Sequence, residues 1–443
     1  MYIILKYERG EMNKEMFKFD IYPKIVKIQS SVIILVVSFE EGVFLKDSHY
    51  KIQITPLISR IDDGHISDRY LEVKCFEERL IQFEYNFLVE QEYIVRVCKI
   101  ENSHEIECAK FSLYALEDDL YHRLPLKGDF HSHSCESDGK ERPEIVASRY
   151  RERGYDFFAL TDHEKYYPSL NAKSFYEPLG LDFLIVPGEE VHSPNNHVHI
   201  INFGGHASVN ELFQSEEGRD TTISEICELK DSFSPATLAD EYVYNSCQWV
   251  CKHIAEVNGL SIFCHPFWQP YAVNVQSGLT QELIRSGMFD AFELVGGQTA
   301  SENSRQIALY NDIREQMGYS MPIVGSSDSH GTVDIAWFDY FKSLVFSKKN
   351  EVNEIIESVK NRYCVAIESY PDEQVRVYGS FRLVNYGYFL LNNWFPLHDF
   401  LCLEEGKSMR EYYLGQSKRS DVEKVKFDYN RFVNKYFSEG DQR

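Results

Sequence analysis

The chain has 443 residues, a formal net charge of −23 and a hydrophobic content of 43%. This length suffices for two or three domains with substantial cores. The negative charge argues against binding extended nucleic acid, because phosphate backbones require a basic surface. No apolar stretch is long enough to span a bilayer, and we find no secretory signal before the ten scattered cysteines. We therefore expect a cytoplasmic protein with reduced thiols and no membrane partner.

The first segment, residues 1–118, is predicted to be a small all-β sandwich. Four of its stretches are rich in Val, Ile, Tyr and Phe with partial alternation: VKIQSSVIILVVSF, HYKIQITPLI, LIQFEYNFL and EYIVRVCKI. Polar clusters such as RIDDGHISD separate them. Because the segment does not concentrate His, Asp or Glu at ligand spacing, we expect it to be a structural or substrate-gating module without catalytic groups.

Near Leu120 the pattern changes to short apolar runs that alternate with helical stretches, which is typical of βα units. Each run is predicted to be a strand that ends in polar residues: FFALTDH, FLIVPGEE, HVHIINFGG, LSIFCHP, AFELVGG and PIVGSSDSH. We assign residues 119–377 to this α/β unit, with an inserted loop or lid at about 206–236. Residues 378–443 are predicted to form an aromatic and helical C-terminal extension that packs on the barrel.

Histidines and carboxylates recur at the ends of these predicted strands. Residues two apart on a strand point the same way, so His131 and His133 can reach one ion, as can His197 and His199. The C-terminal strand ends of a βα barrel converge on one mouth, which predicts a single site. One His-Pro or Asp-His pair alone is commonly a turn, but repetition at successive strand ends indicates metal binding. The candidates are His131, His133, Asp138, His163, Glu189, Glu190, His197, His199, His265, Asp328 and His330.

The motifs HSHSCESDG, LTDH, PGEE, CHP and SSDSH, in that order, resemble the PHP family, named for polymerase and histidinol phosphatase. The resemblance covers roughly residues 126–370. The preceding β segment and the KGDFHSHS entry are most similar to the carbaryl-hydrolase-like branch. The resemblance implies a distorted seven-stranded βα barrel with two or three metal ions. It also implies hydrolysis of phosphomonoesters, phosphodiesters or, in that branch, carbamate and carboxyl esters.

Matched motif by motif, the resemblance implies nine metal ligands. The family motif Gly-x-Glu favours Glu190 as the bridging carboxylate, with Glu189 as the alternative. His197 is the alternative to His199, or a substrate-contacting neighbour. Some members carry His where this chain has Asp138, and a carboxylate shifts the preference from zinc toward manganese or iron. The implied ligands are His131, His133, Asp138, His163, Glu190, His199, His265, Asp328 and His330.

The number of candidate ligands predicts the chemistry. Nine exceed the needs of one ion, so we expect two or three divalent ions of manganese, iron or zinc. Three carboxylates offset only half the charge of three such ions, which suits a small anionic substrate. A metal-activated hydroxide is expected to attack, while Asp328 or His265 moves a proton to the leaving group. Lys165 and Arg305 are candidates for phosphate contact and Trp268 for the pocket wall, although each residue is also ordinary on a surface.

These expectations favour a phosphoesterase that acts on a small phosphorylated metabolite or a short oligonucleotide. The first alternative is a carboxyl ester, carbamate or amide hydrolase on the same metal site, which the similarity to the carbaryl-hydrolase-like branch favours. The second is a non-catalytic metal-binding regulatory protein. Nine ligands disfavour it, because a structural site needs only four closed ligands. The sequence leaves the natural substrate, the metal and the oligomeric state open.

Overall fold

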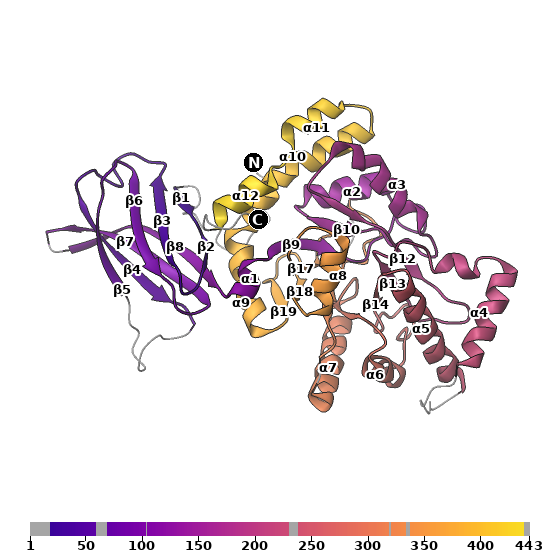
Figure 1. Cartoon of the computed structure of the whole chain (residues 1–443). Helices are drawn as coiled ribbons and strands as arrows, with labels where there is room; N and C mark the ends of the chain where they lie inside the picture. Colours follow the sequence, from indigo (N-terminus) through magenta and orange to yellow (C-terminus); the bar gives the residue numbers. More distant parts are fainter. Residues whose placement is uncertain are drawn as a thin grey trace. The chain divides into compact units, whose positions relative to one another are not determined.

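Contacts within the chain divide it into two units (Figure 1). One unit comprises Met1–Arg123, Val384–His398 and Asp428–Arg443, and the other comprises Leu124–Leu383 and Asp399–Phe427. The expected C-terminal extension is thus shared between the units instead of lying wholly with the α/β unit. The computed structural model describes residues 18–58, 69–102, 104–229, 238–318, 320–333 and 337–437.

The first unit is built around two β-sheets that share one core. A three-stranded antiparallel sheet has the order β1-β3-β6, and a five-stranded sheet has the order β2-β8-β7-β4-β5. Ile34 and Phe83 come from the first sheet, and Ile52 and Val95 from the second; all four are buried in the shared core. The strands are β1 (Phe19–Tyr22), β2 (Ile25–Lys27), β3 (Ser31–Ser38), β4 (His49–Pro56), β5 (Arg69–Lys74), β6 (Leu80–Asn86), β7 (Gln91–Glu101) and β8 (His104–Leu116).

This unit also contains helical residues, so the all-β expectation for it is incomplete. They come from α1 (Asp118–Tyr121), part of α9 (Phe381–Asn393), part of α10 (Phe395–Tyr413), and α12 (Tyr429–Tyr436). The ring of Tyr114 lies 4.9 Å from that of Tyr386 and 5.2 Å from that of Phe389. Tyr386 and Phe389, which are far from β8 in the sequence, therefore pack on the Tyr114 side of that strand.

The second unit is α/β, but its strands lie in two sheets instead of one seven-stranded barrel. The six-stranded sheet has the order β11-β10-β9-β17-β18-β19, and the five-stranded sheet the order β12-β13-β14-β15-β16. The strands are β9 (Leu124–Asp129), β10 (Phe157–Ala159), β11 (Leu184–Val186), β12 (Gly188–Val191), β13 (Ile200–Phe203), β14 (Leu260–Phe263), β15 (Ala291–Val295), β16 (Ile323–Gly325), β17 (Phe341–Ser347), β18 (Cys364–Glu368) and β19 (Arg376–Tyr378).

Several of these strands are antiparallel where a βα barrel requires parallel pairs. β12 pairs antiparallel with β13, and β13 with β14, whereas β14, β15 and β16 are parallel. Only eight residues separate Val191 from Ile200, which is too few for the crossover that a parallel pair needs. Backbone bridges from Ser132 to Ser329 and from His163 to Glu190 connect the two sheets. The strand ends therefore meet at one place despite the interrupted barrel.

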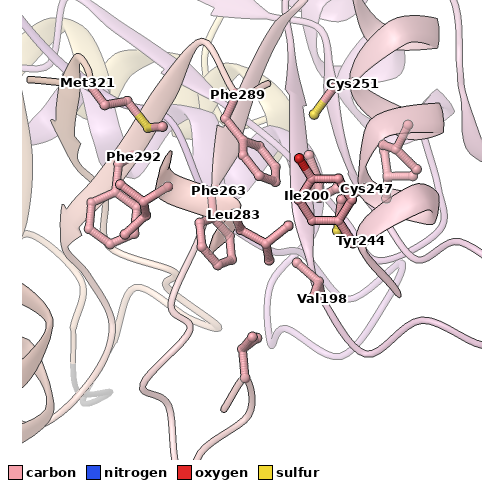
Figure 2. Close-up of a cluster of buried hydrophobic side chains, with 14 of the residues drawn as sticks. Val198, Ile200, Tyr244, Cys247, Cys251, Phe263, Leu283, Phe289, Phe292 and Met321 are labelled. Atoms are coloured by element: carbon pink, nitrogen blue, oxygen red, sulfur yellow. The ribbon is translucent and has the colours of Figure 1, made fainter. Parts of the chain in front are cut away.

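Helices α5 (Leu238–Glu256), α6 (Ser277–Ser286) and α7 (Ala300–Met317) pack against the five-stranded sheet. Figure 2 shows their shared core, in which the Phe263 and Phe289 rings stack 4.9 Å apart, with Leu283 and Met321 nearby. No helix among the described residues has the length and apolar character to cross a membrane. The other helices of this unit include α2 (Pro143–Glu152), α3 (Tyr167–Tyr176), α4 (Glu216–Glu228), α8 (Val352–Lys360) and α11 (Arg419–Val425).

The expected loop at about 206–236 is largely helical over its described part. A 3₁₀ turn spans Asn210–Phe213, and α4 follows, with the Ser215 hydroxyl accepting a 3.0 Å hydrogen bond from Gly218 N at its start. The sequence of α4 does not reveal a helix because only Thr222 and Ile226 are buried, which is too sparse for a visible period. Residues 230–236 of the predicted insertion lie outside the described residues.

Candidate metal centre

Two strand ends from different sheets lie side by side at the base of the site. Asp328 N donates a 3.0 Å hydrogen bond to His131 O, and His133 N donates a 2.9 Å bond to Ser329 O. His131 and His133 are fully buried. The HSHS and SSDSH motifs, nearly two hundred residues apart, are therefore held in register by backbone hydrogen bonds.

Asp129, a buried carboxylate at the end of β9, holds these two segments together. It accepts hydrogen bonds from His131 N (3.2 Å), Ser327 N (2.9 Å) and the Tyr150 hydroxyl (2.9 Å). Burial raises its pKa to about 6, and the hydrogen bonds from Ser327 oppose this rise. Asp129 is thus a positioning residue that sets the spacing between two ligand-bearing loops.

Four side chains converge at the buried end of the site. The Nε2 atoms of His131 and His133 lie 3.1 Å apart, and each lies 3.3 Å from Glu190 Oε2. Asp328 Oδ1 lies 3.2 Å from His131 Nε2 and 3.0 Å from His133 Nε2. Ligands about 2.1 Å from one ion lie about 3.0 Å apart in an octahedron and about 3.4 Å apart in a tetrahedron. The His131, His133 and Glu190 atoms have the spacing of ligands around one divalent ion, and Asp328 Oδ1 lies beside both histidines.

Glu190 faces two groups of histidines with its two oxygens. Oε2 lies 2.8 Å from His163 Nδ1, in addition to the buried pair above. Oε1 lies 2.6 Å from His199 Nδ1 and 3.2 Å from His265 Nε2. Burial disfavours the charged carboxylate, but the neighbouring His199, His163 and His131 outweigh it and hold the Glu190 pKa well below its usual range. Glu190 therefore lies between two groups of histidines, one on each of its carboxylate oxygens.

A third group lies at the open side of the site around Asp138. Its carboxylate is 3.2 Å from His330 Nε2, 3.5 Å from His163 Nε2 and 4.0 Å from His133 Nδ1. The Asp138 side chain is 56% exposed and that of His330 is 33% exposed. Partial burial opposes the charge on Asp138, yet His163 and His330 lower its pKa below the ordinary value. Solvent therefore has access to this end of the cluster.

If these residues bind metal ions, some of their buried nitrogen and oxygen atoms should have no hydrogen-bond partner within the protein. His133 Nδ1, His265 Nδ1 and Glu293 Oε1 are such atoms. An unsatisfied buried polar group costs about 1–3 kcal/mol. In addition, only one of two facing imidazole nitrogens, such as those of His131 and His133, can carry the proton between them. Divalent ions would satisfy the crowded donors of the cluster, so the residues present fit the group that the sequence predicts.

The backbone is strained at two of the predicted ligands. His265 has a φ of 29° and Asp328 a φ of 49°, in the left-handed region that non-glycine residues rarely adopt. A hydrogen bond of 3.1 Å from Trp268 N to His265 O helps to hold the first of them. Such strain costs about 1–3 kcal/mol and is concentrated at functional sites.

The two alternatives that the sequence left open occupy distinct environments. Glu189 points away from the histidines and accepts hydrogen bonds from Asn202, the Ser208 hydroxyl, Val209 N and Asn210. His197 is exposed, and its backbone carbonyl accepts a 3.1 Å hydrogen bond from Asn274. Glu190 and His199, by contrast, lie inside the cluster.

Of the three predicted substrate-contacting residues other than His197, two lie near the cluster and one does not. The Trp268 ring lies 6.0 Å from that of His265 and is 39% exposed. The Lys165 ammonium donates to the backbone carbonyl of Glu136, in the loop that carries Asp138. Arg305 is exposed on α7, and the structure gives it no contact with the histidine cluster among the described residues.

Sequence reasoning missed three residues of the cluster: His192, Cys264 and Glu293. His192 Nε2 lies 3.0 Å from His163 Nδ1, and Glu293 Oε2 lies 3.2 Å from His131 Nδ1. Burial raises the pKa of the Cys264 thiol well above its usual value. His192 follows Glu190 by two residues, but its approach to His199 depends on a hairpin whose register the sequence does not give. Glu293 stands inside an apolar run, in FELVGG, where a buried carboxylate needs a partner.

Comparison with known proteins gives remote likenesses in structure. No family model and no curated protein matches the chain. A two-domain protein from Bacteroides vulgatus containing a predicted PHP-like metal-dependent phosphoesterase is similar, with 19% identity over 55% of this chain and a TM-score of 0.39. The match spans 65% of that protein's length. An amidohydrolase from Chromobacterium violaceum, with bound sulfate and no metal, has 17% identity over 48% of this chain and 90% of its own, with a TM-score of 0.33.

Both TM-scores lie below 0.5, so the assignment of function depends on the residues of this chain. Neither structure bears on the carbaryl-hydrolase-like branch.

Proposed function

We propose that this chain is a metal-dependent hydrolase that cleaves phosphoester bonds. One observation carries the proposal: imidazole nitrogens from the ends of four strands converge on the two oxygens of a single buried carboxylate, Glu190. A purely structural ion is enclosed by four ligands, whereas this cluster extends from fully buried His131 to half-exposed Asp138. An extended, one-sided donor set is suited to ions that also contact a substrate.

Bound divalent ions would supply Lewis acidity and an acidified water. The residues of the chain would supply position and charge. Glu190 would hold two cations at a fixed separation, and Asp129 would keep the His131 and Asp328 segments in register. Asp328 has a side chain that is 15% exposed, so its carboxylate is the buried group best placed to pass a proton toward solvent. His265 is more enclosed, which favours a role in holding charge.

The number of bound metal ions determines the net charge of the pocket, and the net charge determines which class of substrate it attracts. Four carboxylates surround the cluster once Glu293 is included: Asp138, Glu190, Glu293 and Asp328. Three divalent ions would leave a net positive pocket that attracts a phosphate ester, whereas two ions would leave a neutral one. The phosphoesterase proposal therefore rests on occupancy of the Asp138 group as well as the buried ones.

Carboxyl ester, carbamate or amide hydrolysis is the second candidate. It is favoured by the partly exposed ring of Trp268 near His265, which offers an apolar surface to an uncharged substrate. Lys165, a predicted phosphate contact, already donates to the backbone carbonyl of Glu136. The two candidates use the same metal ligands and differ in what lines the mouth.

The proposal is tested by metal analysis and kinetics on one preparation of the full chain. We expect two or three transition metals per chain after loading with manganese or zinc. Phosphate esters should turn over faster than matched carboxylate esters, with inorganic phosphate as a competitive inhibitor. Fewer than one metal per chain would refute the metal-dependent hydrolase. Preferred turnover of carboxylate esters without phosphate inhibition would establish the second candidate instead.

A further inference from the structure

We infer that His192 is a direct ligand of a metal ion, completing a site with His163, Glu190 and His199. The inference deepens the proposed function and rests on it, because it assumes that the cluster binds cations. His192 belongs to none of the nine ligands that the motifs imply. Its place follows from the β12–β13 hairpin, not from spacing within one strand.

The register of that hairpin brings His192 and His199 face to face. β12 and β13 pair with Gly188 opposite Phe203 and Val191 opposite Ile200. Continued by one residue, the same register places His192 opposite His199. The two rings stack with centroids 4.0 Å apart and planes inclined by 25°. Both imidazoles therefore project from the same end of the hairpin toward Glu190.

The distances around His192 suit a shared cation. Its Nε2 lies 3.0 Å from His163 Nδ1 and 3.8 Å from Glu190 Oε1. One donor atom from each of His163, Glu190, His192 and His199 can be chosen so that all four lie within 4.8 Å of one another. The His192 side chain is 23% exposed, so the site is lined by protein on most sides and still reachable.

A hydrogen bond between His192 and His163 is the simplest alternative, but it explains only one of the contacts. His163 Nδ1 also lies 2.8 Å from Glu190 Oε2, and Glu190 Oε1 lies 2.6 Å from His199 Nδ1. One cation in contact with His163, His192, His199 and Glu190 accounts for all three close approaches. It would also offset the crowding of imidazole nitrogens that otherwise face one another.

The ligand set predicts the preference of this position. Three imidazoles and one carboxylate suit zinc or iron, whereas the group around Asp138 is more open and contains the more exposed carboxylate. The ion held by His192 should therefore be the one that resists removal, and the ion near Asp138 the one that exchanges. Substitution of His192 should remove this difference between the two positions.

The test compares variants of two histidines on the same segment. His192→Ala and His192→Gln remove the proposed ligand, and His197→Ala is the matched control because His197 is exposed outside the cluster. The full chain is stripped with chelator and reloaded with zinc. Metal content and zinc affinity are then measured by elemental analysis and chelator competition, with the melting curve of the ion-free protein as a check on folding.

We expect both His192 variants to bind about one zinc fewer per chain, or to bind one zinc more than about a hundredfold more weakly, because the loss of a residue that only orients a ligand costs about 10–100-fold. His197→Ala should match the wild type. Gln can keep a hydrogen bond to His163, so full zinc affinity in His192→Gln would overturn the inference in favour of a positioning role. Full affinity in His192→Ala would overturn it as well. If His192→Ala does not fold, His192→Gln decides. Wild-type protein without bound zinc would instead refute the proposed function itself.

Discussion

The buried and the open side of the metal centre use the same residue types in opposite environments. His131, His133 and Glu190 are fully enclosed, whereas the Asp138 side chain is 56% exposed and that of His330 is 33% exposed. Electrostatic attraction is much stronger where water is excluded. The enclosed residues are therefore suited to bind a cation tightly, and the exposed residues are suited to let a cation and a substrate exchange with solvent.

The largest effect is expected at the carboxylate that connects the two sides. Glu190→Gln should lower bound metal below one ion per chain and reduce hydrolysis by about a thousandfold or more, since bridging charge is lost from a buried site. Elemental analysis and kcat/KM measure both consequences. Glu189→Gln is the control: its four hydrogen-bond donors lie outside the cluster, so stability should fall while metal content stays. Equal metal loss in both variants would contradict the assignment of Glu190.

Replacing one histidine on the buried side should reduce activity more than replacing one on the open side. His131→Ala should reduce kcat/KM by about a thousandfold, because a water-excluded ligand has no substitute. His330→Ala, which opens a position that water already reaches, should cost about ten- to a hundredfold. Matched kinetics at saturating manganese measure the difference. An equal loss in both variants would show that the two sides are not functionally distinct.

The ion-free protein should respond to pH through His163. Burial disfavours its charge, but Glu190 and Asp138 outweigh burial and raise its pKa to about 10. The raised pKa means that its contribution to stability is complete below the unfolded value of about 6.5 and is lost as pH rises toward 10. Urea midpoints in chelator should therefore fall across this range, and His163→Gln should flatten the fall. With zinc bound, the dependence should largely disappear, because the ion replaces the proton.

The smallest effect is expected at the mouth, at Trp268. Trp268→Ala should lower kcat/KM for substrates with aromatic leaving groups by about three- to tenfold, since one partly exposed ring contributes about 1 kcal/mol. Trp268→Phe should restore most of the loss. Metal content should not change in either variant. A loss that is independent of the leaving group would assign the residue to packing around His265.

The sequence predicts the cluster better than the fold that holds it. The HxH and DxH spacings identify His131, His133, Asp328 and His330 as strand-end residues because period-two geometry is local. The interrupted barrel was not predictable in the same way. The short connection after Val191 makes β12 and β13 antiparallel, but the division of the strands into two sheets depends on pairings between segments far apart in the sequence.

Two further differences have physical causes. The helix α4 lies in a polar stretch whose buried residues are too few to show a period. His192 was overlooked because its partner, His199, is reached across a hairpin whose register the sequence does not state. Local patterns thus reveal donors that share a strand, and miss donors that meet across a turn.

The loop that contains Gly297 lies so close to the Ser327–Asp328 backbone that position 297 has no room for a side chain. A Cβ atom there would lie 2.5 Å from Ser327 O and 2.8 Å from the Asp328 side chain. Any larger residue would push away a backbone that already has a positive φ at Asp328. In a library of random variants, position 297 should therefore be as intolerant as a ligand position, although glycine has no side chain to offer. Ranking positions by mutational tolerance would place it among the histidines, and only the distances explain why.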